Sequence, residues 1–188
     1  MMVRRIQMQW LVCVVLIAGA AAHATTLARM TLRGMTHVAE LVVRARCVES
    51  LVRWDAGEIW TFTTFEIEEA WKGSPPRQIV VRLLGGTTAE LTSSVDGVPR
   101  FRAGEEVVLF LSATGRGDYS VVSWMQGTFR VARDRETGRA SATQDTAAFA
   151  TFDPVTRQFI VNGIRNRRLE QLRKEVEAAL GEKAGRGE

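Results

Sequence analysis

Few side chains in this sequence could act as nucleophiles or metal ligands. Beyond residue 24, the 188-residue chain has one cysteine, Cys47, and one histidine, His37. Cys47 shares a face of a predicted strand with Val43, where cysteine behaves as a small buried hydrophobe, whereas a nucleophilic thiol needs an exposed, electropositive setting. His37 and Glu40 could relay a proton or bind a metal weakly, but no second histidine joins them, and we expect a packing or surface role. The sequence thus predicts no catalytic residue, no metal site and no cofactor.

Paired carboxylates are a second candidate for chemistry. Glu66 and Glu68 share one face of a predicted strand, about 7 Å apart by strand geometry. Such a pair can do acid–base work or bind Ca²⁺. Arg44 and Arg46 share a face of the preceding strand, however, so cross-strand ion pairs explain the pattern more simply. We expect these carboxylates to be structural.

Aromatic residues give the clearest indication of a binding surface. Trp60 and Phe62 share one parity of a predicted strand, and Phe65 and Ile67 share the other. If Phe65 and Ile67 face the core, Trp60 and Phe62 point outward, with Trp54 nearby on the preceding strand. Exposed aromatics on a sheet often mark a binding surface. The alternative is that a C-terminal amphipathic helix covers them.

A second group of candidate residues follows the loop at 85–104. Phe101 is predicted to close one end of a β-barrel. Glu105 could accept hydrogen bonds from backbone amides or pair with Arg100 or Arg102. The five tentative binding residues are therefore Trp54, Trp60, Phe62, Phe101 and Glu105.

The elements that would position these residues are mostly strands. Period-two alternation begins at Leu41, a turn follows at 55–57, and a second strand covers 58–71, so the two form a long hairpin. The change of apolar parity in the second strand predicts a β-bulge near Thr63-Thr64. Strand 105–111 is apolar on both faces, so it should be central and covered. Further strands are predicted at 79–84, 119–124, 128–133, 139–143, 149–152 and 157–161.

Two helices complete the predicted domain. Residues 31–39 have helical spacing, and an amphipathic stripe from about Arg167 should end at Gly181. We expect a mainly β protein, an OB-like small β-barrel with a short N-terminal helix and a C-terminal amphipathic helix. Residues 25–181 would form a single domain, and 182–188 a disordered tail.

The first residues have the pattern of an export signal. Arg4 and Arg5 precede the apolar run WLVCVVLIA and the small-residue end AHA, which predicts a signal peptide over 1–24 that is cleaved after Ala24. The apolar run is shorter than the ~20 residues that span a membrane. An uncleaved anchor is the alternative. Cleavage predicts a periplasmic or extracellular protein without a membrane span.

The charge of the chain argues against nucleic-acid partners. Removing Arg4 and Arg5 from the net charge of +4 leaves about +2, and basic residues alternate with acidic ones along the sequence. A mildly basic, mixed surface gives little support to nucleic-acid binding.

Several segments resemble an uncharacterised family of secreted bacterial proteins. They are LVVRARCVES, TFTTFEIEEAWKG, IVVRLLGG, GVPRFRAGEEVVLFL and QGTFRV, within about 25–131. The family's fold is similar to the OB barrel of netrin-like domains and tissue inhibitors of metalloproteinases. Those inhibitors hold a protease zinc through an N-terminal cysteine. The predicted mature chain starts at Thr25 instead, so the thiol clamp is absent, although the Thr25 amino group could ligate a metal.

Together these patterns predict a non-enzymatic binding module outside the cytoplasm. It would engage a protein partner, or an envelope polymer, through aromatics on the barrel and the loop at 85–104. The alternatives are an inhibitor of a secreted protease, an enzyme whose site is built from carboxylates, Thr and Arg, and a single-stranded nucleic-acid-binding protein.

Overall fold

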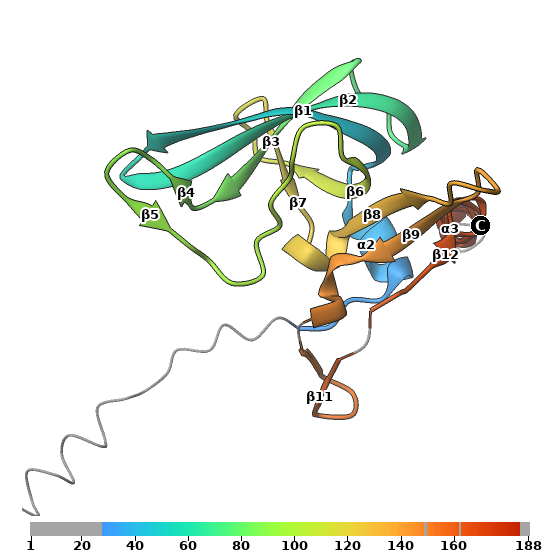
Figure 1. The fold of residues 1–188 in the computed structure, drawn as a ribbon. Coiled ribbons are helices and arrows are strands. Elements are labelled where there is room, and N and C mark those ends of the chain that lie inside the picture. Colours follow the sequence, from blue (N-terminus) through green and yellow to red (C-terminus); the bar gives the residue numbers. More distant parts are fainter. Residues whose placement is uncertain (1–27, 149, 162, 185–188) are drawn as a thin grey trace, which may run out of the picture.

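The computed structural model describes residues 28–148, 150–161 and 163–184. The predicted signal peptide lies outside these ranges. The main element of the described chain is one eight-stranded sheet (Figure 1). Its strands are β1 (Leu41–Asp55), β2 (Glu58–Lys72), β3 (Gln78–Leu84), β6 (Glu106–Ala113), β7 (Tyr119–Val121), β8 (Thr128–Arg133), β9 (Ala140–Gln144) and β12 (Arg167–Arg168).

Shorter elements connect or cover this sheet. Two small hairpins pair β4 (Gly86–Thr87) with β5 (Thr92–Ser93), and β10 (Thr151–Asp153) with β11 (Gln158–Ile160). The helices are α2 (Leu32–Val38) and α3 (Leu169–Ala184), with 3₁₀ turns η1 (Trp124–Gly127) and η2 (Asp145–Ala148). In the described part of the chain, no helix has both the length and the apolar character needed to cross a membrane.

Five strands close into a barrel. Along the sheet they run β1-β2-β3-β7-β6, and β6 pairs back onto β1. The β3–β7 contact is parallel, with Val81 opposite Tyr119, while the other pairs in the ring are antiparallel. This closure is that of an OB-like barrel. The predicted fold class is confirmed, including both helices.

The bulge lies at the predicted level but on the neighbouring strand. Cys47 pairs with Phe65 and Glu49 pairs with Thr64, so Val48 of β1 is the extra residue. The odd-numbered residues from Ile59 to Phe65 are buried without a change of phase. The sequence misplaced the bulge because Phe62, although apolar, does not face the barrel interior.

Strand β6 separates two hydrophobic cores. Its Leu109 and Leu111 face the barrel interior, where they join Phe65. Its Val108 and Phe110 face a second core. Phe129 of β8 and Leu172 and Val176 of α3 complete that second core. The prediction of a strand covered on both faces is therefore confirmed.

The C-terminal helix extends beyond its predicted end. Gly181 was expected to terminate α3, yet the helix continues to Ala184. An interior glycine costs a helix only about 1 kcal/mol. In addition, Glu182 forms a 2.6 Å surface ion pair with Arg33 of α2, which adds a small stabilisation to the last turn. The first residues of the predicted tail are thus helical, and residues 185–188 lie outside the described ranges.

Candidate binding surface

A groove opens at the end of the barrel where the β1–β2 turn meets the β4–β5 hairpin. It has a volume of about 390 Å³. The side chains of Trp54 and Leu91 are 55% and 53% exposed beside it, while Ile59 is buried at its base. We call it the Trp54 groove. It is lined by Trp54, Gly57, Glu58, Ile59, Leu84, Leu91, Thr92, Ser93 and Val95.

The turn that carries Trp54 is held by charged neighbours. Ala56 and Gly57 both have positive φ, as a tight two-residue hairpin turn requires. The carboxylate of Asp55 lies 2.8 Å from Arg82 of β3 and 3.5 Å from Arg116 of the β6–β7 turn. These ion pairs link the β1–β2 turn to β3 and to the β6–β7 turn. They restrain the end of β1 that carries Trp54.

Trp60 and Phe62 are covered by arginines. The Arg82 guanidinium lies 4.1 Å from the Trp60 ring centroid, and Arg53 lies 3.9 Å from that of Phe62. Phe62 is buried and Trp60 half-buried as a result. Both aromatics point outward, but α3 packs instead near Trp71 at the other end of β2. Cation–π stacking therefore covers this face, which neither sequence interpretation anticipated.

Phe101 and Glu105 have structural roles away from the groove. Phe101 is buried in the barrel core and meets Phe65 edge-to-face, with 5.0 Å between ring centroids. Glu105 accepts a hydrogen bond from the Arg102 backbone N–H at 3.1 Å and pairs with Arg130. The predicted amide cap is present, whereas the pairing arginine is Arg130 rather than Arg100 or Arg102.

The five tentative binding residues thus do not form one site. Only Trp54 lines the groove. The structure brings Leu91 and Val95 beside it, and neither was singled out in the sequence. The available signal was that Leu91 and Val95 are apolar residues in a mainly polar stretch of the loop.

The carboxylates considered for chemistry are held by arginines. Glu68 forms a 2.6 Å ion pair with Arg46, and Glu66 pairs with Arg77 at 2.9 Å. The expected ion pairing is confirmed, although Glu66 is paired from the loop before β3 rather than from β1.

Glu106, at the start of β6, is the centre of a larger arginine cluster. Its carboxylate is only 7% exposed and accepts hydrogen bonds from Arg44 at 2.9 Å and Arg133 at 2.8 Å. Burial opposes ionisation, but the hydrogen bonds and charges of Arg133 and Arg44 outweigh it and lower the pKa of Glu106. The carboxylate therefore stays ionised at neutral pH.

Cys47 and His37 lack the setting that chemistry needs. Burial raises the pKa of the Cys47 thiol, so the thiolate is disfavoured. Glu40 does not orient His37, because its carboxylate accepts the Ala113 backbone N–H at 2.9 Å. Within the described ranges, no group of three or more His, Cys, Asp or Glu side chains is arranged to hold a metal ion.

The described chain is an OB-like barrel with one apolar groove at its open end. No known protein family matches the sequence, and no curated protein matches it. The resemblance to secreted, netrin-like proteins therefore stays a prediction from the residues quoted above.

Proposed function

We propose that this protein is a non-enzymatic binding module that works outside the cytoplasm and captures a protein partner in the Trp54 groove. The observation that carries the proposal is the exposure of Trp54 and Leu91 across one preformed groove. Protein interfaces concentrate their binding energy in such large anchors, and tryptophan is prominent among them. Thr92, Ser93 and Glu58 supply the polar rim that surrounds an apolar interface core.

The surroundings of the groove favour a protein over a nucleic acid or a polymer. Stacking of bases or sugars needs open aromatic faces, but Arg53 and Arg82 occupy those of Phe62 and Trp60. Trp54 alone offers a large open ring there. A single aromatic ring with Leu91 beside it can hold one apolar side chain of a protein partner. A nucleic acid or polysaccharide would need several open rings, one for each repeating unit.

The state of the acidic residues supports a non-enzymatic role. A general acid or base must be able to exchange its proton with a substrate. Arginines instead hold Glu66, Glu68, Glu105 and Glu106 in ion pairs.

A pull-down tests this proposal. Tagged protein would serve as bait in extracts of the cell envelope and culture fluid, beside a Trp54→Ala/Leu91→Ser variant. We expect a partner that the unaltered protein retains and the variant loses. If the retained partner is a protease, the protein would act as a protease inhibitor. Intact mass of the exported protein checks the location, with Thr25 as the expected first residue.

The matched control removes a different exposed apolar pair. Val155 and Phe159 lie on the β10–β11 hairpin, away from the barrel. Val155→Ser/Phe159→Ser should retain the partner. Equal retention by the groove variant, with thermal melting showing that it is folded, would show that the groove is not the binding site.

A further inference from the structure

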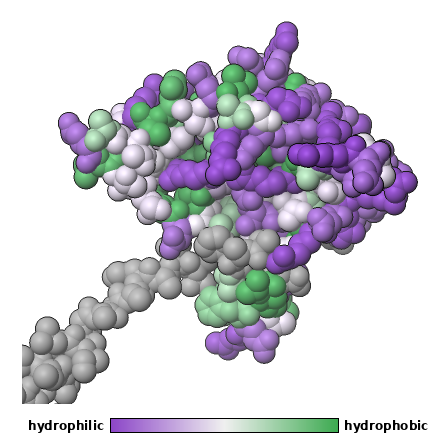
Figure 2. Space-filling model, in the orientation of Figure 1, coloured by the Kyte–Doolittle hydropathy of each residue, from purple (hydrophilic) through white to green (hydrophobic). Residues whose placement is uncertain are grey.

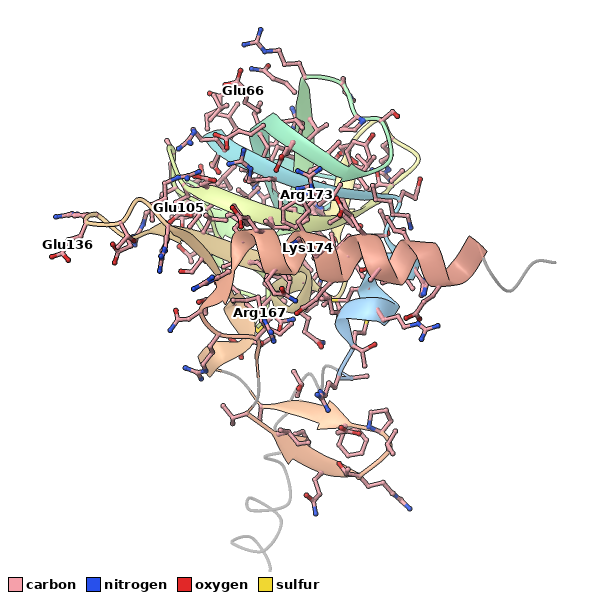
Figure 3. The ribbon with its side chains drawn as sticks, turned by 90° about the vertical axis from the view of Figure 1, so that its right-hand side faces the viewer. Glu66, Glu105, Glu136, Arg167, Arg173 and Lys174 are labelled. Carbon is pink, nitrogen blue, oxygen red and sulfur yellow. The ribbon has the colours of Figure 1, made fainter. Side chains whose placement is uncertain are left out.

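A second concave site lies on the opposite side of the molecule from the Trp54 groove. It is a cleft of about 570 Å³ between the start of α3 and the β8–β9 turn. Figure 3 faces this side, with α3 crossing the view, Arg173 on it and Glu136 marking the turn. The lining residues of this arginine cleft are Arg44, Glu69, Trp71, Arg133, Thr137, Gly138, Arg139, Ala140, Arg168, Leu169, Glu170 and Arg173.

The charges lining the arginine cleft do not balance. Five arginines and two glutamates face it. Hydrophilic residues accordingly cover the right-hand side of the molecule in Figure 2, where α3 and the β8–β9 turn lie in Figure 1. The side chains of Arg139 and Arg168 have no hydrogen-bond or ion-pair partner among the residues that the structure describes. An excess of positive charge therefore remains in the cleft.

The two unpaired arginines are close neighbours. Arg168 of β12 pairs with Ser141 of β9. Arg139, immediately before β9, is two residues from Ser141 and lines the same cleft as Arg168. Two guanidinium groups that line one cleft without carboxylate partners repel each other, and an anion bound between them would remove the repulsion.

The other arginines of the cleft are held by ion pairs with carboxylates. Arg133 is held by Glu106 at 2.8 Å, and Arg173 by Glu69 at 2.8 Å. Arg44 contacts the same two carboxylates, with its Nε 3.3 Å from Glu69 and its Nη1 2.9 Å from Glu106. The arginines at the floor of the cleft are therefore pre-organised by carboxylates.

We infer that the arginine cleft binds a phosphate-bearing ligand, with Arg139 and Arg168 contacting the phosphate. Guanidinium groups make paired, charge-assisted hydrogen bonds to phosphate oxygens. A phosphate group brings more than one negative charge in a compact tetrahedron, which matches several arginines better than a single carboxylate does. The cleft volume lies within the ~300–1,000 Å³ of small-ligand sites. This site is independent of the proposed function.

Calorimetric titration of the purified protein with pyrophosphate tests the inference. We expect saturable binding that weakens about tenfold or more in Arg139→Gln/Arg168→Gln. The control is Arg77→Gln/Arg102→Gln, which removes the same charge outside the cleft and should bind as the unaltered protein does. Absence of saturable binding at low salt, or equal weakening in both double variants, would overturn the inference.

Two further arms identify the source of the phosphate. Vesicles of phosphatidylcholine with phosphatidic acid present the same group on a lipid. Sedimentation of the protein with them, reversed by pyrophosphate, would assign a lipid headgroup, whereas pyrophosphate binding alone would assign a soluble phosphorylated molecule. Both support the cleft as a phosphate site. If hexaglutamate binds about tenfold tighter than pyrophosphate, the phosphate assignment is wrong and an acidic peptide takes its place.

Discussion

At the scale of single residues, arginine is the side chain that organises this protein. Arg82 is buried over Trp60 and pairs with Asp55, while Arg44 and Arg133 enclose Glu106. Both groups of side chains cover parts of the outer sheet surface on which no helix or second sheet of the described chain packs. Arginine can do this because its planar guanidinium stacks on rings and bonds to carboxylates at once.

Replacing Arg82 should therefore destabilise the fold and uncover Trp60. We expect Arg82→Ala to lower the free energy of unfolding by about 2 kcal/mol, from lost cation–π contact and a lost charge-assisted hydrogen bond. Urea unfolding followed by tryptophan fluorescence measures both effects. Arg77→Ala, at a side chain that is 86% exposed, should change stability by less than about 0.5 kcal/mol. Equal effects would show that burial of Arg82 does not matter.

Glu106 makes the free energy of unfolding depend on pH. Its pKa is lower in the folded chain than in the unfolded chain, so the unfolded chain takes up a proton first. The stabilisation is present above the ordinary carboxyl pKa and is lost as the pH falls through the lowered one. We expect the free energy of unfolding to fall as the pH drops below the ordinary carboxyl pKa of about 4.3. Glu106→Gln should flatten this dependence and cost about 2 kcal/mol at neutral pH.

The matched control for that measurement is Glu66→Gln. Glu66 pairs with the exposed Arg77, so its replacement should leave the acid dependence nearly unchanged. A Glu106→Gln variant with the same pH profile as the unaltered protein would contradict the role given to Glu106.

At the scale of elements, two glycines illustrate different constraints on the backbone. Gly127 ends η1 immediately before β8, and a Cβ there would stand against the backbone carbonyl of Val122. Gly181 lies within α3 with open space around it. One glycine is therefore required by packing, whereas the other is tolerated.

Alanine substitutions at these two glycines should have opposite effects. Gly127→Ala forces a backbone shift and should destabilise by about 1–3 kcal/mol. Gly181→Ala should stabilise by about 0.5–1 kcal/mol, because alanine favours the helix. Thermal unfolding of both variants measures this. Destabilisation by Gly181→Ala would contradict the continuation of α3 to Ala184.

At the scale of the whole molecule, the Trp54 groove and the arginine cleft lie at opposite ends. The β4–β5 hairpin and α3 occupy opposite sides of the view in Figure 1. The two sites share no lining residue. Their binding energies should therefore be independent.

Measuring each site in the other's variant checks this independence. Trp54→Ala/Leu91→Ser should bind pyrophosphate within about twofold of the unaltered protein, since distant sites add without coupling. Arg139→Gln/Arg168→Gln should retain the protein partner. A tenfold change of pyrophosphate affinity in the groove variant would mean that the two ends are coupled.

The sequence by itself determined the order of the longer strands and of the two helices, the long hairpin and the strand covered on both faces, but not the short strands β4, β5 and β12. These features follow from apolar alternation and turn residues, which are local signals. It also located the level of the bulge, although not its strand, because Phe62 is buried under Arg53 rather than inside the barrel. Strand 119–124 was overextended, since the chain turns into η1 at Trp124.

Only the tertiary structure decided which residues meet. Leu91 and Trp54 line one groove because the β4–β5 hairpin packs on β1 and β2, and Arg139 and Arg168 line one cleft because β12 joins β9. Such contacts join segments distant in the chain, and no local pattern encodes their pairing. The ion pairs expected between β1 and β2 could be foreseen because a tight hairpin makes strand pairing a local property.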